Sequence, residues 1–181
     1  RFIAIAEASR LVDDGCSFAA LVKPHGVMIR TFERFFPSAA PFADLVPVMP
    51  LRSALGALQA KLPRMIGVHI RRQDNQRSIV TSPTLEFVRK MHAELKREPA
   101  TEFFLATDDP REEARLRQEF GALIHTYPKH TARRRDPQAA RDAVVDLYGL
   151  AACRKLLGSH YSSFTDTAAA IRGIPLQIVG R

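Results

Sequence analysis

Short apolar segments that suit β-strands alternate with segments of helical periodicity along the whole sequence, and this alternation constrains the fold more than any other feature. The strand-like segments lie at residues 18–24, 45–50, 65–72, 101–108, 122–127 and 174–180. The helix-like segments lie at residues 2–14, 51–62, 83–98, 110–120, 137–157 and 164–173. Such alternation is typical of a parallel sheet whose two faces are both covered by helices. The sequence therefore predicts an α/β fold.

Three of the predicted helices begin with a proline that follows a potential capping residue. Ser82, Asp109 and Asp136 each precede a proline. Serine and aspartate side chains accept hydrogen bonds from the first helical turn, and proline fits the first helical position. Glu112 follows Asp109 at the spacing of a capping box. We therefore expect helices to start at these three places, with Asp109 serving as a cap.

Polar side chains collect at the ends of two predicted strands and where LLGSHY leads into the helix near Phe164. They are His69, Arg71, Arg72 and Asp74 at the end of strand 65–72, Thr107, Asp108 and Asp109 at the end of strand 101–108, and Ser162 and Ser163 after LLGSHY. In an open parallel sheet, ligands bind in the crevice beyond the carboxyl ends of the strands. The sequence therefore predicts one polar crevice at this edge of the sheet.

The two adjacent arginines suggest an anionic ligand. Side chains alternate across a strand, so His69 and Arg71 share one face and Arg72 lies on the other. The planar guanidinium group donates paired hydrogen bonds to phosphate and stays charged at any biological pH. We favour a diphosphate-binding role for Arg71. For Arg72, a structural ion pair with Asp74 or with a helical acid is as good an explanation as phosphate binding. His69, taken alone, is better explained as an ordinary strand residue.

The serines before the last helix and two carboxylates could also contact a ligand. Ser162 and Ser163 precede a helix whose free N–H groups favour an anion, although an N-cap would also place serine there. Asp146 lies in the apolar stretch AVVDLYGLAA, where a carboxylate is costly unless it is paired or contacts a ligand. Asp108, unlike Asp109, has no capping role that would explain it.

The net charge of +8 also points to an anionic partner, which leaves nucleic acid, nucleotide and phosphorylated substrate open. Much of the excess lies in residues 128–141, where Arg133, Arg134 and Arg135 are adjacent. No RNA-binding or helix-turn-helix signature accompanies this run. We therefore interpret it as a solvated loop and expect no nucleic-acid partner.

Several classes of protein and site are disfavoured. No apolar run is long enough to span a bilayer, so we expect a cytoplasmic protein without a membrane span. Cys16 and Cys153 are far apart, which suits reduced thiols. The histidines lack zinc-binding spacing with the cysteines, and no Walker loop, GxGxxG or GxSxG motif occurs. We expect no metal, and a nucleotide site, if present, built from side chains.

Three segments together resemble a known superfamily. HIRRQD (69–74), FFLATDDP (103–110) and DLYGLAACRKLLGSHYSSF (146–164) resemble, in this order, the motifs of the α-1,6-fucosyltransferases and protein O-fucosyltransferases, which include bacterial nodulation fucosyltransferases. The resemblance implies a GT-B architecture. Its Rossmann-like, donor-binding lobe would span residues 63–181, and a short or truncated N-terminal α/β lobe on the acceptor side would span residues 1–62.

The resemblance further implies inverting transfer of fucose from GDP-fucose to a glycan or other hydroxyl acceptor, with no cofactor and no required metal. Arg71 and Arg72 would be the catalytic residues. Arg71 would contact the β-phosphate, with Arg72 and His69 beside it. Asp146 would read the guanine or ribose. The remaining donor-site residues would be Asp74, Thr107, Asp108, Asp109, Ser162 and Ser163.

Two alternatives remain open, one because of a departure from the family pattern and one because of the basic run. Core-fucosylating relatives carry a glutamate ten residues after the motif histidine as the proposed acceptor base, whereas this sequence has Ile79. A nucleotide-sugar binder that is non-catalytic or differently specific is therefore one alternative. The basic run at 133–135 suggests the other, a nucleic-acid-binding α/β domain.

Overall fold

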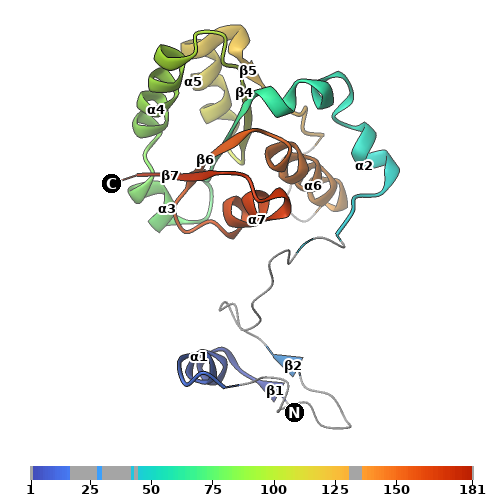
Figure 1. Ribbon diagram of the computed structural model, residues 1–181, viewed down its shortest axis with the longest axis vertical. Coiled ribbons are helices and arrows are strands. Elements are labelled where there is room, and N and C mark those ends of the chain that lie inside the picture. The colour runs from blue at the N-terminus through green and yellow to red at the C-terminus, as the bar shows by residue number, and fades with distance from the viewer. Residues whose placement is uncertain (1, 17–27, 30–41, 43–44, 131–135, 181) are drawn as a thin grey trace. The chain divides into compact units, whose positions relative to one another are not determined.

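A computed structural model of the chain describes residues 2–16, 28–29, 42, 45–130 and 136–180 (Figure 1). The chain divides into two compact units, Arg1–Ala39 and Ala40–Arg181. In the first unit, strand β1 (Phe2–Ile3) precedes helix α1 (Ile5–Asp13) and pairs in parallel with strand β2 (Met28–Ile29). The helix expected at residues 2–14 thus begins at Ile5, and the strand expected at residues 18–24 lies outside the described residues.

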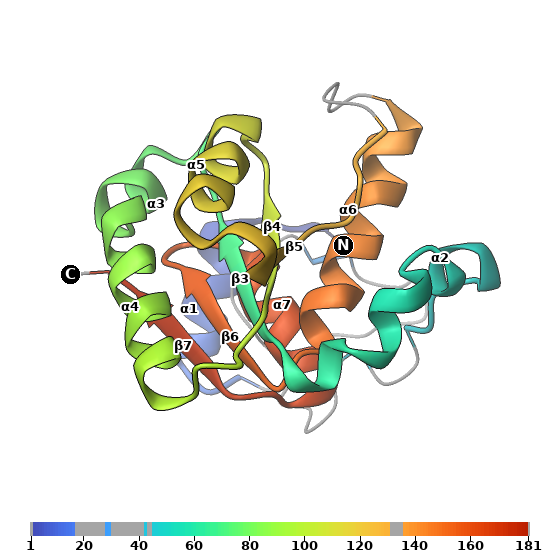
Figure 2. The same cartoon turned by 90° about the horizontal axis from the view of Figure 1, so that it is seen from above.

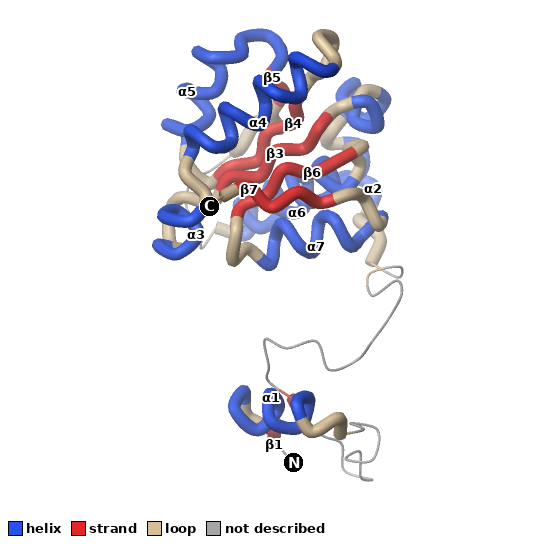
Figure 3. The backbone as a smooth tube through the Cα atoms, turned by 60° about the vertical axis from the view of Figure 1, so that its left-hand side comes forward, coloured by secondary structure: helices blue, strands red, loops and turns tan. Residues whose placement is uncertain are grey.

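The second unit is built around a five-stranded sheet in which every pair of neighbouring strands is parallel. The strands are β3 (Ile66–Ile70), β4 (Phe103–Thr107), β5 (Ile124–His125), β6 (Lys155–Ser159) and β7 (Leu176–Val179), in the spatial order β5-β4-β3-β6-β7 (Figure 3). The chain moves outward from β3 in one direction and then resumes at β6 in the other. This order places a topological switch point between β3 and β6.

Helices cover both faces of this sheet, as the strand–helix alternation predicted (Figure 2). The helices are α2 (Met49–Ser53), α3 (Gln76–Thr81), α4 (Thr84–Arg97), α5 (Pro110–Phe120), α6 (Pro137–Ala151) and α7 (Ser163–Arg172), with short 3-10 turns at Gly56–Ala60, Leu62–Arg64 and Gly121–Leu123. Ile66, Val68 and Ile70 pack with side chains from α4 and α5. Phe104, Ala106 and Leu156 pack with side chains from α6 and α7 on the opposite face.

The segment before β3 differs from its prediction. Residues 45–48 pair with no described strand, and the chain enters α2 at Met49 instead of continuing a strand to residue 50. The helix expected at residues 51–62 is divided into the end of α2 and two 3-10 turns. Proline explains the first change, because Pro47 lacks the N–H of a strand ladder whereas Pro50 suits a first helical turn. Gly56, with a φ of 47°, interrupts the predicted helix.

This segment also bears on the division of the chain. We predicted a boundary between residues 62 and 63, whereas the two compact units meet between Ala39 and Ala40. Leu55 and Leu62 are buried in the cluster that packs on the α6 and α7 face of the sheet. The segment that contains Leu55 and Leu62 therefore packs against the core of the second unit.

The prediction of one helix over residues 137–157 is wrong at its C-terminal end. Helix α6 ends at Ala151, and residues Lys155–Ser159 form β6, which lies between β3 and β7. A strand buried on both faces appears in the sequence as a continuous apolar run, which periodicity alone does not distinguish from a buried helix. Hydrogen bonds to two neighbouring strands fix the outcome.

The predicted helix starts are largely confirmed. Asp109 accepts a hydrogen bond from the Arg111 N–H and caps α5, and Asp136 caps α6 through the Gln138 N–H. Ser82 does not cap α4; its hydroxyl accepts from the His160 N–H instead. Of the helices in the described ranges, none has the length and apolar character needed to cross a membrane.

Candidate active site

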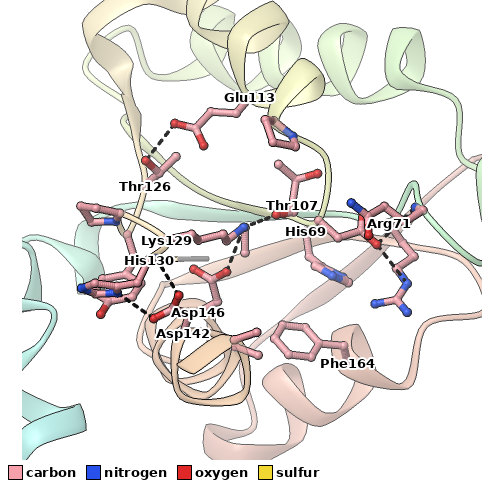
Figure 4. A pocket seen from close by; sticks show the side chains of 18 of the residues that line it. His69, Arg71, Thr107, Glu113, Thr126, Lys129, His130, Asp142, Asp146 and Phe164 are labelled. Atoms are coloured by element: carbon pink, nitrogen blue, oxygen red, sulfur yellow. Dashed lines mark hydrogen bonds and ion pairs between the residues drawn. The ribbon is translucent and has the colours of Figure 1, made fainter. Parts of the chain in front are cut away.

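A cavity of about 660 Å³ lies beyond the carboxyl ends of β3, β4 and β5, between these strand ends and helices α6 and α7 (Figure 4). Its lining includes His69, Arg71, Thr107, Asp108 and Asp146, five of the residues that the sequence singled out. This is the edge of the sheet at which a crevice was predicted. The strand-end rule therefore located the cavity correctly.

A second cavity of about 380 Å³ adjoins the first at the switch point between β3 and β6. It is lined by Ser162 and Ser163 at the start of α7, and it shares Arg71 and Phe164 with the larger cavity. Ser162 occupies the N-cap position of α7 without a side-chain capping bond. Its hydroxyl and the first N–H groups of α7 therefore suit an anion held beside Arg71.

Arg71 lies at the junction of the two cavities, with its side chain 25% exposed. One terminal nitrogen lies 2.5 Å from Asp74 Oδ1, and Nε lies 3.3 Å from Asp108 Oδ2. Asp108 also accepts hydrogen bonds from the backbone N–H groups of Arg72 and Gln73. Asp108 and Asp74 thus hold the loop after β3 and orient the guanidinium group, and Asp74 itself does not line either cavity.

Arg72 is directed to the opposite face of the sheet, as strand alternation predicted, and lines neither cavity. Its side chain is 8% exposed, and its terminal nitrogens donate to the carbonyl oxygens of Arg71 and Ser82 and to the Thr84 hydroxyl. Nε pairs with Glu112 Oε1 at 3.4 Å. The structure therefore separates Arg72 from the candidate catalytic group and gives it the ion pair with a helical acid that the sequence left open.

His69 lies in the floor of the larger cavity. Its Nδ1 is 2.7 Å from the Thr165 hydroxyl, and its ring packs on Phe164 at a centroid distance of 4.8 Å. Burial, reinforced by the positive charges of Arg71 and Lys129, lowers the pKa of His69 to about 3. The imidazole is therefore neutral at physiological pH and presents a ring and hydrogen-bonding nitrogens without adding charge.

Asp146 lies across the cavity on α6, where burial raises its pKa to about 7. Lys129 Nζ lies 3.3 Å from Asp146 Oδ2 and also donates to the Thr107 carbonyl. Sequence reasoning selected Asp146 and missed Lys129. The signal was present, because Lys129 follows the strand predicted at residues 122–127 in the same way that Arg71 follows β3.

Asp142 and His130 are two further residues that the sequence reading missed. Asp142 Oδ2 accepts from the His130 N–H at 2.8 Å, and Oδ1 lies 2.9 Å from His130 Nδ1 and 3.0 Å from Gln138 Nε2. Burial acts to raise the pKa of Asp142, but the hydrogen bonds from His130 and Gln138 lower it below its usual value. Asp142 lies one helical turn before Asp146, a spacing that places both on one face of α6.

The remaining predicted residues have mainly local roles. The Thr107 hydroxyl accepts from the Asp109 N–H, and Asp109 caps α5 outside both cavities. Ile79, at the position of the family's glutamate, is half-buried on α3 and lines neither cavity. Among the described residues, no three His, Cys, Asp or Glu side chains are grouped as metal ligands would be.

Comparison with solved structures identifies the fold. Over 92% of this chain, the structure resembles the NodZ alpha-1,6-fucosyltransferase from a crystal soaked with GDP-fucose, with a TM-score of 0.61 and 19% identity. Over 86% of this chain, it resembles POFUT1 in complex with GDP, with a TM-score of 0.57 and 13% identity. The matches cover 59% of NodZ and 55% of POFUT1. No protein-family profile and no curated protein sequence matches the chain.

These likenesses confirm, at the level of the fold, the resemblance that the three sequence motifs indicated. The second unit is the Rossmann-like, parallel-sheet lobe of a GT-B fold, and the N-terminal α/β unit is short. The chain spans little more than half the length of the NodZ and POFUT1 structures named above.

Proposed function

We propose that the protein is a glycosyltransferase that transfers a sugar, fucose in the first instance, from a GDP-linked donor to a hydroxyl group of a glycan or another acceptor. The observation that carries the proposal is the position of Arg71, which lies between a cavity large enough for a nucleoside and a second cavity at a helix N-terminus. This arrangement suits a nucleoside diphosphate whose phosphates contact Arg71. The fold shared with structures containing GDP-fucose or GDP supports the same donor class.

In this proposal, each end of the site takes one part of the donor. The larger cavity holds the nucleoside against Asp146 and the neutral His69. Arg71, Ser162 and Ser163 hold the diphosphate at the junction, and the sugar extends into the smaller cavity.

The chemistry required of Arg71 is stabilisation of a leaving group. As the bond between the sugar carbon and the phosphate oxygen breaks, negative charge grows on the departing diphosphate. A guanidinium group fixed in advance by Asp74 and Asp108 stabilises that charge more than it stabilises the intact donor, and this difference lowers the barrier. Arginine supplies the positive charge at this position, so we propose that turnover requires no added metal.

The first test is calorimetric titration with GDP, UDP and ADP in a buffer containing EDTA. GDP is expected to bind more tightly than either of the others, because carboxylates suit the N–H donors of guanine. Equal binding of the three nucleotides, or a strict requirement for magnesium, would contradict the proposal. Formation of a glycosylated product from GDP-fucose and a panel of glycans then tests transfer itself.

A second candidate function is donor binding without turnover. Ile79 favours it, because this side chain cannot accept a proton from an acceptor hydroxyl. Tight GDP-fucose binding without product on any acceptor would select the binder. Tight, steeply salt-dependent binding of nucleic acid without GDP binding would select neither, and would revive the nucleic-acid-binding alternative.

A further inference from the structure

The Lys129 ammonium group lies inside the larger cavity, and no part of the proposed chemistry accounts for it so far. Its side chain is 34% exposed, and Nζ contacts both the Thr107 carbonyl and Asp146 Oδ2. It therefore connects the end of β4 with α6 across the cavity (Figure 4). An ammonium group has three donors, so Lys129 can make a further hydrogen bond to a ligand.

Asp146 presents the complementary feature. Its side chain is 6% exposed, and among the hydrogen bonds of the described residues none reaches Oδ1. A buried acceptor without a donor costs about 1–3 kcal/mol. That cost is removed if a ligand in the cavity supplies an N–H group to Oδ1.

The neighbouring carboxylate of Asp142 does not offer the same opportunity. Both of its oxygens already accept hydrogen bonds from His130 and Gln138. Asp146 and Lys129 are therefore the acceptor and donor that remain available side by side in this part of the cavity. Tyr127 and His130 line the same end with their rings, which suits a planar ligand.

The order of donor and acceptor discriminates between the purines. Guanine has its O6 acceptor next to the N1–H and exocyclic amino donors, so it matches a lysine beside a carboxylate. Adenine has the reverse order, an exocyclic amino donor next to the N1 acceptor. It would direct its amino group at the ammonium and its N1 lone pair at the carboxylate. Uracil shares the O4 and N3–H pattern but lacks the second ring and the amino group.

We propose that Lys129 is the residue that selects guanine over adenine, with Nζ donating to O6 while Asp146 accepts from N1–H. This inference rests on the proposed function, because it concerns the nucleoside half of the same donor.

The test compares nucleotide selectivity in the parent protein and in Lys129→Met by calorimetry. A hydrogen bond to a charged group contributes about 1.5–3 kcal/mol, so GDP affinity should fall by about 10- to 100-fold. ADP affinity should change by less than about threefold, because ADP does not use the ammonium group as a donor. Lys129→Arg should recover part of the lost selectivity. Lys61→Met is the matched control, since Lys61 makes a 3.9 Å ion pair with Glu102 and does not line the cavity.

A comparison of ligands tests the proposal without any variant. Inosine diphosphate retains O6 and N1–H and lacks the exocyclic amine, so the parent protein should prefer it to ADP. Equal affinity for inosine diphosphate and ADP, or an unchanged ratio of GDP to ADP affinity in a folded Lys129→Met protein, would overturn the role of Lys129 and leave the proposed function standing. Failure of the parent protein to bind any of these nucleotides would overturn both.

Discussion

The neighbouring arginines at the end of β3 have opposite surroundings on the two faces of the sheet. On the face covered by α4 and α5, Arg72 is buried and its guanidinium group is taken up by two backbone carbonyls, a hydroxyl and Glu112. On the face covered by α6 and α7, Arg71 forms ion pairs with Asp74 and Asp108 and lines two cavities. Consecutive residues of one type can thus have different surroundings, one in the packed core and one at a cavity, because the strand directs them to different faces.

The packing beneath each arginine explains the difference. On the α4 and α5 face, large side chains fill the space up to Ile70, the last residue of β3. On the α6 and α7 face, the residues paired with His69 on β4 and β6 are the small residues Ala106 and Gly158. A Cβ atom at Gly158 would lie 2.1 Å from Thr165, so α7 approaches β6 closely here. Ala106 lines the larger cavity, whereas Gly158 lets Thr165 of α7 approach β6 and contact His69.

The largest expected effect tests the face covered by α4 and α5, which we call the closed face. Arg72→Met removes the cation from Glu112, whose side chain is 14% exposed, and leaves the Ser82 carbonyl without its donor. Breaking such a buried pair should lower the free energy of unfolding by about 3 kcal/mol, measured by urea denaturation. Arg89→Met, which breaks an exposed ion pair with Glu86, should cost less than about 1 kcal/mol. A stable Arg72→Met protein that lost GDP binding would show that both arginines serve the donor.

The next effect tests the face covered by α6 and α7, which we call the open face because it borders the two cavities. Arg71→Lys keeps the charge but loses the planar fork, so donor affinity should weaken modestly while the transfer rate falls by about 100-fold. The unfolding free energy should change by less than about 1 kcal/mol, because the Arg71 pairs are partly solvated. Arg72→Lys should give the opposite pattern, with lower stability and a nearly normal rate. Transfer at the parental rate by Arg71→Lys would remove the distinction between the two faces.

A smaller effect concerns the stability that the protein loses because Asp146 is buried on the open face. Burial raises the pKa of Asp146 above its value in the unfolded chain, with Asp142 and Glu113 reinforcing the rise and Lys129 opposing it. The folded state therefore holds this proton more tightly, and the stability that it contributes at low pH is lost as the pH rises from about 4 through about 7. Asp146→Asn should be more stable than the parent at pH 8, by on the order of 1 kcal/mol, and this advantage should shrink at pH 5.

Unfolding curves of both proteins at the two pH values measure this difference. Asp166→Asn, which removes an exposed carboxylate from α7, serves as the control. An advantage of Asp146→Asn that is the same at pH 5 and pH 8 would mean that Asp146 titrates alike in the folded and unfolded chains.

The smallest effect is expected from the basic run Arg133, Arg134 and Arg135, which lies outside the described residues. Replacing all three with glutamine should change GDP affinity by only a few-fold, or less than about 1 kcal/mol, because we interpret the run as a solvated loop. Calorimetry with GDP measures this directly. A hundredfold loss would place these arginines in the donor site and extend the open face beyond the cavity described above.

Sequence reasoning succeeded where local chemistry determines structure. Helix α5 has the bounds that were predicted, because Asp109 and Pro110 start it and Gly121, with a φ of 56°, ends it. The opposite orientations of Arg71 and Arg72 followed from the two-residue period of a strand. These features depend on neighbouring residues alone.

Sequence reasoning failed where residues distant in the sequence determine the structure. The apolar run that forms β6 acquires its strand conformation from β3 and β7, so its own pattern did not reveal it. Lys129 and His130 follow β5, a two-residue strand at the edge of the sheet, and the sequence marked them only as polar residues that come after a predicted strand. Their importance becomes visible only when α6 brings Asp142 and Asp146 alongside.

The spatial order of the strands also has a consequence in time. The His69 carbonyl accepts a hydrogen bond from the Ser159 hydroxyl, a residue 90 positions later in the chain. While the protein is being synthesised, β3 can pair with β4 early, but its other edge stays open until residues 155–159 have left the ribosome. The proposed diphosphate site, which would need Arg71 from one segment and Ser162 from the other, therefore cannot form until both segments have been synthesised. Such long-range closure is intrinsically slow, so a nascent chain will expose this unpaired strand edge to chaperones or to aggregation.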